Sequence, residues 1–300
     1  MPLDPDNLQT PLRKLRKMLK AFPQSPSLEM VHDLRIRTRR VEAMLRALRL
    51  DTKRNEQKLL KAVKPIRRRA GQVRDMDVLT GLATKLRPDG EQECLVELLE
   101  HLGAQRDQFS RKLRRRVRQD GPPVRQRLKR TSRFVGKVFD RTKKPGQQPD
   151  KASEWSADAA ALALELSSEL AQWPRLDARN LHAYRLKVKE LRDVLLLAEN
   201  ADTGFVKILG EVKDAAGEWH DWQELGGIAE QVLDHGLGCE VLKLARSIAK
   251  AKFNHALSLA NRMRHDYLQE PNRRRPARAQ RMPGAHLKPT VIAATSALVA

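Results

Sequence analysis

One helical pattern occurs twice in this chain, and the repetition constrains the fold more than any other feature of the sequence. Residues 31–46 read VHDLRIRTRRVEAMLR, and residues 181–196, 150 positions later, read LHAYRLKVKELRDVLL. At 100° per residue, each segment gathers cations on one side and large apolar side chains on the other. A histidine opens both basic rows at the same position. The rows are His32, Arg35, Arg39 and Arg46 in the first segment, and His182, Arg185, Lys189 and Arg192 in the second.

The opposite sides of both segments are apolar, which predicts that each helix lies against a core. Basic side chains three or four positions apart lie about one helical turn apart, a spacing that suits an extended polyanion better than a single small anion. The alternative is that each row is the solvated face of an ordinary surface helix. The apolar sides consist of Leu34, Val41, Leu45 and Leu48 in the first segment, and of Tyr184, Leu191 and Leu195 in the second.

A second motif repeats at nearly the same offset. Residues 70–77 read AGQVRDMD and residues 216–223 read AGEWHDWQ, so the two share Ala-Gly and an aspartate four positions after the glycine. Because the two offsets agree within a few residues, the duplication covers a unit of several helices. The chain is therefore predicted to consist of two related halves.

The residues of both motifs resemble the CHAD domain, the conserved histidine α-helical domain. The resemblance rests on residues 31–40, on Gly71 with the RDMDVL segment at 74–79, and on residues 181–192, and it spans roughly residues 8–268. It implies an all-α fold of two pseudo-symmetric four-helix bundles with a basic cavity or groove. It also implies binding of inorganic polyphosphate and association with polyphosphate granules.

Three positions depart from the pattern of that family. Glu42 stands where an arginine is usual, and Glu190 stands opposite Arg40, so each basic row has an acidic interruption. His220 replaces the basic residue that corresponds to Arg74.

The charge and composition of the chain point independently to a helical protein with an anionic partner. Lys and Arg number 59 against 37 Asp and Glu, which gives a formal charge of +22. An excess of this size favours a polyanion as partner. Leu, Ala, Arg, Lys and Glu dominate with a period near 3.6, and no sustained strand alternation occurs, so the fold is expected to be all-α.

The chain is predicted to divide into a first helical-bundle repeat at 1–142, a linker at 143–153, a second repeat at 154–268 and a basic, disordered tail at 269–300. The tail is expected either to have no role or to touch a granule or membrane surface. The predicted helices span 12–22, 28–50, 91–119, 123–142, 154–172, 179–199, 204–233 and 237–268, with further helical sequence at 55–84 and a break at Gly121-Pro122-Pro123.

Polyphosphate is expected to be held by guanidinium forks, which engage two phosphoryl oxygens at once, and by lysines acting as point charges. The basic run from Arg111 to Lys144 is expected to extend this surface. His32 and His182 are either protonated donors to phosphate or neutral residues bonded to a carbonyl, to Asp75 or to Asp221. The predicted polyphosphate contacts are His32, Arg35, Arg37, Arg39, Arg46, Arg74, His182, Arg185, Lys187, Lys189 and Arg192.

A catalytic function is not expected, because the sequence has no phosphate-binding loop, no His-Glu-x-x-His motif and no dinucleotide fingerprint. No cofactor and no metal site are predicted, and Cys94 and Cys239 are too few for a zinc site and are not expected to pair. The alternatives are a phosphate-handling enzyme that uses the repeated histidines, and an RNA- or DNA-binding protein. Nucleic acid is less favoured, because aromatic residues make up only 4% of the chain and supply few stacking platforms.

The location and protein partners of the chain are less constrained. The first residues lack a basic and then apolar leader, so a cytoplasmic protein is expected. The apolar end of the tail, 291–300, is about half the length that a bilayer crossing needs, so no transmembrane segment is predicted. Protein partners cannot be named, although an adaptor that tethers other proteins to a granule is compatible with the pattern.

Overall fold

The structure of the chain is a computed structural model that describes residues 1–90, 92–142, 151–234 and 238–268. The prediction of an all-α fold is confirmed. The helices are α1 (Pro5–Lys20), α2 (Leu28–Ala47), α3 (Arg54–Ala83), α4 (Gln92–Thr142), α5 (Lys151–Ala171), α6 (Leu181–Leu195), α7 (Thr203–Val232) and α8 (Glu240–Met263). A 3-10 turn, η1 (Leu50–Thr52), joins α2 to α3, and a π-helical turn, η3 (Arg264–Leu268), follows α8.

The two helices that carry the basic rows, α2 and α6, bury equivalent faces. Ser27 caps α2, since its Oγ accepts a hydrogen bond from the backbone N–H of Met30 at 3.2 Å. Five buried positions of α2 recur in α6 at an offset of 150, which explains why both basic rows face away from the core. The buried pairs are Val31 and Leu181, Leu34 and Tyr184, Thr38 and Val188, Val41 and Leu191, and Met44 and Val194.

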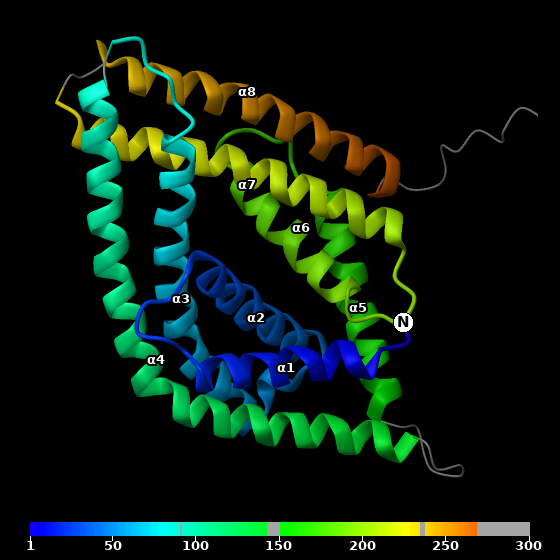
Figure 1. Cartoon of the computed structure of the whole chain (residues 1–300). Coiled ribbons are helices and arrows are strands. Elements are labelled where there is room, and N and C mark those ends of the chain that lie inside the picture. The colour runs from blue at the N-terminus through cyan, green and yellow to red at the C-terminus, as the bar shows by residue number, and fades with distance from the viewer. Residues whose placement is uncertain (91, 143–150, 235–237, 269–300) are drawn as a thin grey trace, which may run out of the picture. The chain divides into compact units, whose positions relative to one another are not determined.

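Several helix contacts recur in the two halves, although α1 packs closely on α4, whereas α5 packs on the η3 turn that follows α8. α3 lies beside α4 and α7 beside α8, while α2 packs on α3 and α6 packs on α7 (Figure 1). Across the halves, α3 meets α7 and α2 meets α6. This packing is what a duplicated unit would give, and the duplication into two four-helix bundles stays a prediction.

The core is shared between the two halves. Residues Met1–Gln269 form one compact unit. The larger buried cluster draws on helices of both halves, and the smaller cluster joins the end of α3 and the start of α4 to the end of α7 and the start of α8. Cys94 and Cys239 both lie buried in the smaller cluster. Neither half therefore buries its apolar surface by itself.

The first residues of the chain also tie the halves together. Leu3 pairs with Ala198 in an isolated antiparallel bridge directly after α6. Asp4 donates its N–H to the carbonyl of Leu197 at 3.1 Å. The backbone before α1 is thus anchored to the segment that follows α6.

The predicted break at Gly121-Pro122-Pro123 is wrong, because α4 continues through it. Figure 1 shows that α4 changes direction along its length, with one part beside α3 and another beside α1. Each proline removes a helical hydrogen bond and so favours a bend. Val117 and Val124, on either side, are both buried, and this packing holds the chain helical on both sides of the prolines.

Several predicted boundaries shift in the structure. α1 begins at Pro5, seven residues earlier than predicted, because Asp4 caps it and Pro5 is compatible with the first turn. Part of the predicted linker, 151–153, belongs to α5, whereas 143–150 and the predicted tail 269–300 lie outside the described residues. The boundary between the repeats stays a prediction. Among the described helices, none is both long enough and apolar enough to cross a bilayer.

One buried ion pair links α3 to α4. Arg106 Nε donates to Asp77 Oδ1 at 2.7 Å, and the Asp77 side chain is only 1% exposed. Arg106 also donates to the carbonyl of Pro26 at 3.4 Å, in the loop between α1 and α2. The sequence did not reveal this pairing of Arg106 with Asp77.

Replacing Arg106 with alanine is expected to lower the free energy of unfolding by about 3 kcal/mol, because the Asp77 carboxylate would stay buried without its partner. Urea denaturation followed by circular dichroism measures the change. The control is Arg13→Ala, which breaks a solvent-exposed pair with Asp6 and is expected to cost less than about 1 kcal/mol. Equal losses in the two variants would contradict the prediction.

Candidate anion-binding site

α2 and α6 bring their two basic rows to one place. The pKa of the Arg39 guanidinium is lowered to about 10, first by burial and then by the charges of Arg35, Arg67 and Arg185. These neighbours come from α2, α3 and α6, so the crowding arises from the fold and not from one helix. We call the group the central cation cluster, which consists of Arg35, Arg39, Arg67, Arg185 and Lys189.

Lys189 lies in this cluster and titrates near neutrality. Burial and the charge of Arg39 lower the pKa of its ammonium group to about 7, against the opposing charge of Asp193. Within the described part of the chain, neither Lys189 nor Arg39 forms an ion pair or a side-chain hydrogen bond. Both residues therefore offer cationic heads that nothing described neutralises by direct contact.

The acids around the cluster only partly offset its charge. Arg35 lies 3.8 Å from Asp75, but burial raises the pKa of Asp75 despite that neighbour. Burial likewise raises the pKa of Asp193, although Lys189 lies nearby. For both acids, burial outweighs the attraction of the neighbouring cations, so the charged carboxylate is less favoured here than in water.

The repeated Ala-Gly motif makes room for one arginine in each half. A Cβ built on Gly217 would lie 2.7 Å from Arg185 Nη2, and one built on Gly71 would lie 3.7 Å from Arg35 Nε. Arg185 Nε donates to the backbone carbonyl of Lys213 at 3.1 Å. The glycine in α7 thus lets Arg185 lie flat against that helix, and Gly71 leaves similar but looser space for Arg35.

Two bases that the sequence analysis did not select also reach the site. Arg67 precedes Gly71 by four positions and Lys213 precedes Gly217 by four, so they are equivalent within the repeat. Arg67 lowers the pKa of Arg39, and Arg67 also pairs with Glu42 from α2. A base one helical turn before each glycine was the signal that would have identified both residues.

The second repeated histidine lies against another imidazole. The ring centroids of His182 and His220 are 4.3 Å apart. Burial lowers the pKa of His182, and His220 and Arg185 add to the effect. The Nδ1 atom of His182 is buried and has no hydrogen-bond partner among the described residues.

The first repeated histidine occupies a related environment. Desolvation lowers the pKa of His32, and Arg74, which corresponds to His220 in the repeat, lowers it further. Neither His32 nor its counterpart His182 hydrogen-bonds to Asp75 or Asp221, the acids that the sequence offered as structural partners. Both histidines therefore favour the neutral form in the free protein at pH 7.

The remaining predicted contacts divide into paired and unpaired residues. Arg74 has no ion pair with a described residue, and Arg192 Nε is buried without a partner beside Gly210. Three others are engaged by acids, so an anion would have to compete for them, and their role stays a prediction. The pairs are Arg37 with Asp33 at 2.7 Å, Lys187 with Glu169 at 2.7 Å, and Arg46 with Glu42 at 3.4 Å and Glu190 at 3.6 Å.

One group of described residues has donor atoms close enough for a metal ion. The group is His220, Asp221 and Glu224 on α7, and its donor atoms lie within 4.8 Å of one another. His220 Nδ1 lies 3.7 Å from the Asp221 carboxylate and 3.8 Å from that of Glu224. Exposed acidic groups are common without a bound ion, so the cluster does not by itself indicate a metalloenzyme.

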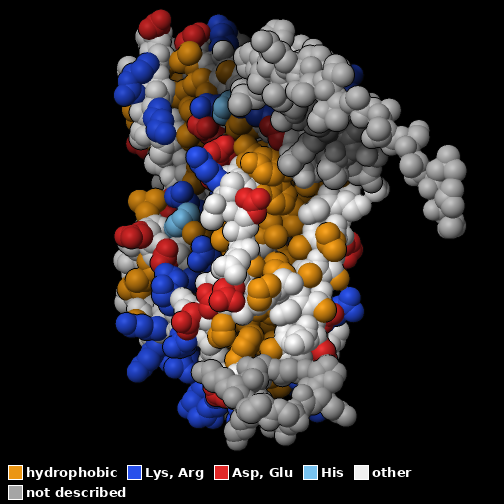
Figure 2. All heavy atoms as spheres, turned by 90° about the vertical axis from the view of Figure 1, so that its right-hand side faces the viewer, with side chains coloured by type: hydrophobic (Ala, Val, Ile, Leu, Met, Phe, Trp, Pro, Cys, Tyr) orange, Lys and Arg blue, Asp and Glu red, His pale blue; other side chains and the backbone are white. Residues whose placement is uncertain are grey.

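Charge on other parts of the surface is mixed. Figure 2 shows one face of the protein, on which Lys and Arg side chains gather along one side with Asp and Glu among them. Arg49 is an example of a surface cation that pairs with an acid, since its Nε atom lies 3.1 Å from Asp158 Oδ1. Because such cations are already neighbours of acids, the overall charge of +22 says less about binding than the unpaired Arg39 and Lys189 do.

Alanine substitution of the two glycines is expected to separate their roles. Gly71→Ala is expected to raise the free energy of unfolding by about 0.5–1 kcal/mol, because alanine favours a helix and the added Cβ fits. Gly217→Ala is expected to lose this gain, because Arg185 must move and release the Lys213 carbonyl. Urea denaturation of both variants measures the difference, and an equal gain at the two sites would contradict the close packing of Arg185.

Comparisons with known proteins identify the family and the fold of the chain. The sequence model of the CHAD domain matches residues 8–229. Among solved structures, the CHAD domain from the plant Ricinus communis matches with a TM-score of 0.62 and 16% sequence identity, covering 87% of this chain and 90% of that one. At this identity the likeness concerns the fold alone. A search of the curated proteins gave no match.

The family match covers both histidine helices and both Ala-Gly motifs. It therefore includes every residue of the central cation cluster. The chain belongs to the CHAD domain family.

Proposed function

We propose that this protein binds inorganic polyphosphate, without catalysis, through the central cation cluster. The observation that carries the proposal is that Arg39 and Lys189, from different halves, lie together unpaired among further cations. Bringing these charges together lowers stability, and a polyanion would reverse that cost. Membership of the CHAD family supports a polyphosphate-related role.

The residues around the cluster suit binding better than chemistry. Guanidinium groups hold phosphoryl oxygens but do not attack them at neutral pH. Two of the described candidates for acid-base catalysis, His182 and His220, lie against each other, so a positive charge on one imidazole disfavours a positive charge on the other. We therefore propose a binding protein rather than an enzyme.

Nucleic acid is the weaker candidate for the same surface. Single-stranded nucleic acids are held in part by stacking on aromatic rings. Trp155, Trp219 and Trp222 are at most 4% exposed, and Tyr184 is fully buried. These rings stabilise the helical core and are not available to bases.

Binding to polyphosphate would place the protein on polyphosphate granules, and we include this location in the proposal. Long polyphosphate presents many chain segments to each protein molecule, so attachment to a granule needs no further contact. A cytoplasmic location and the identity of protein partners stay predictions.

Removing charge from the cluster is expected to abolish selective binding. The triple variant Arg35→Ala/Arg39→Ala/Lys189→Ala is expected to bind long polyphosphate about 100-fold more weakly, since each lost contact contributes about 1 kcal/mol. Competition titrations at about 150 mM salt, where long-range charge is screened, compare polyphosphate with structured RNA and duplex DNA.

A charge-matched control accompanies this variant. Lys243→Ala/Lys250→Ala/Arg262→Ala removes three exposed cations from α8 and is expected to change affinity only slightly. Similar losses in the two triple variants, or equal binding to all three polymers, would indicate a generic basic surface and favour nucleic acid.

Binding is expected to weaken as pH rises from 6 to 9. Lys189 has a pKa of about 7 in the free protein, so it loses its charge over this range. A bound polyanion favours the charged form and raises the pKa, so binding takes up a proton. Affinity measured across this range, with proton uptake from calorimetry in two buffers, tests the effect.

The charged groups that face Lys189 define the control. Arg39, Arg35 and Arg185 lower its pKa, and Asp193 opposes them. Lys189→Arg keeps the site cationic at every pH in the range and is expected to flatten the profile, leaving the part that His32 and His182 contribute. A Lys189→Arg profile as steep as that of the wild type would rule out Lys189 as the source.

A further inference from the structure

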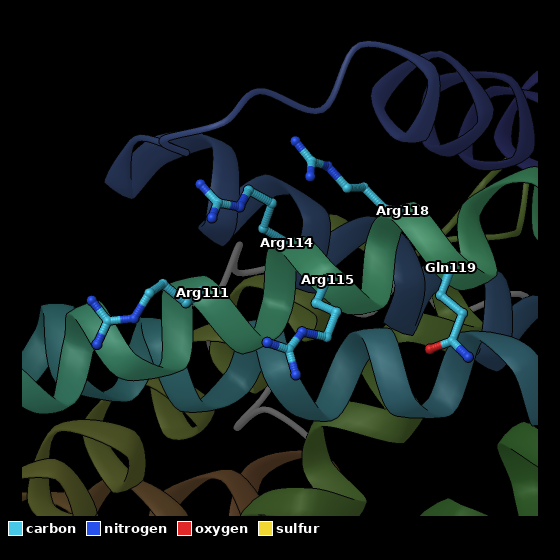
Figure 3. Close-up of a pocket in the computed structure, with 5 residues that line it drawn as sticks. All are labelled: Arg111, Arg114, Arg115, Arg118 and Gln119. Carbon is cyan, nitrogen blue, oxygen red and sulfur yellow. The ribbon is translucent and has the colours of Figure 1, made fainter.

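A hollow of about 580 Å³ lies on α4, outside the central cation cluster. Four arginines and one amide line it, and all come from two turns of the helix before the proline bend. Figure 3 shows the four arginine side chains extending from this stretch, with Arg114 and Arg118 directed to one side and Arg115 to the other. The lining residues are Arg111, Arg114, Arg115, Arg118 and Gln119.

The spacing of these arginines concentrates charge on one face of α4. Positions i, i+3, i+4 and i+7 fall within about 100° of arc on a helix. None of the four forms an ion pair with a described residue. Like charges at this spacing lower the stability of a helix, so an anion in the hollow would remove a cost that the free protein carries.

The neighbouring arginine on the opposite side of α4 has an acidic partner, unlike the four that line the hollow. Arg116 Nε lies 2.6 Å from Asp120 Oδ2, and Arg116 does not line the hollow. The acid in this stretch of helix is thus placed away from the hollow. The segregation leaves one side of α4 balanced and the other side cationic.

One of the lining arginines also contacts another part of the chain. Arg114 is half-buried and donates from Nη1 to the carbonyl of Gln24 at 3.2 Å, in the loop between α1 and α2. Arg106, two turns earlier, holds the same loop through Pro26 and is anchored to buried Asp77. This contact fixes Arg114 against the loop, whereas Arg111, Arg115 and Arg118 are exposed.

We propose that this hollow is a second oligophosphate-binding site, separate from the central cation cluster. The proposal rests on the proposed function, because it assigns the same class of ligand. A chain of a few phosphates carries adjacent charged groups that guanidinium forks can engage in pairs. The residues of the hollow come from α4, whereas those of the central cluster come from α2, α3 and α6, so the two sites share no side chain.

Tripolyphosphate is the probe, because a short chain reports each site separately. Isothermal titration of the full chain at about 0.1 M salt, where screening acts over about 10 Å, is expected to give two molecules bound per protein. The variant Arg111→Ala/Arg115→Ala/Arg118→Ala is expected to bind one. It leaves the half-buried Arg114 and its hydrogen bond intact, and alanine preserves the helix.

The matched control removes three other exposed cations from the same helix. Lys129→Ala/Arg130→Ala/Arg133→Ala carries the same change in charge but lines no described hollow, and it is expected to bind two molecules. Circular dichroism confirms that each variant is folded. If this control loses a site as the hollow variant does, charge alone is responsible and the proposal is overturned.

The central triple variant separates the two proposals. With Arg35, Arg39 and Lys189 replaced by alanine, one tripolyphosphate is expected to remain bound, and adding the hollow substitutions is expected to remove it. If the hollow variant binds as many molecules as the wild type, the second site is overturned while the proposed function stands. If the central variant instead leaves binding unchanged, the proposed function fails.

Discussion

The structure depends on the burial of two equivalent apolar faces in one shared core. Once Val31 and Leu181 and the residues that follow them are buried, the basic rows of α2 and α6 can only lie on the other side. Because α2 meets α6 across the halves, those rows then approach each other. The hydrophobic effect thus supplies the stability that holds like charges together, and the shifted pKa values of Arg39 and Lys189 are its electrostatic consequence.

Much of this could be predicted from the sequence, because the signals were periodic. The helices, the apolar faces and the basic rows follow from spacing within one segment. The course of α4 could not be predicted, because prolines end a helix or bend it according to the packing on either side, and here Val117 and Val124 hold it. The start of α1 could have been predicted, because Asp4 followed by Pro5 is a typical helix N-terminus.

The two basic rows of the site could be predicted from the sequence, but which of their cations enter the central cation cluster could not. Arg37 and Arg39 were both predicted contacts, yet Arg37 pairs with Asp33 on its own helix while Arg39 enters the cluster. Which cation stays unpaired depends on the acids within reach, both on its own helix and on helices from elsewhere in the chain. Arg67 is a site residue that the sequence analysis missed. Its position one helical turn before Gly71 points to the site only when the structure shows that Arg35 lies against that glycine.

The two halves differ in one systematic respect. At three equivalent positions the first half has arginine where the second has a residue that titrates more readily: Arg39 and Lys189, Arg67 and Lys213, and Arg74 and His220. Arginine stays charged throughout the physiological range, whereas lysine and histidine lose their charge when burial and neighbouring cations disfavour it. In the second half, Lys189 shows this effect, since burial and the charge of Arg39 lower its pKa to about 7. If the central cation cluster binds a polyanion as proposed, the lysine at position 189, where the first half has Arg39, is expected to make the affinity depend on pH, because a bound anion favours the charged ammonium form.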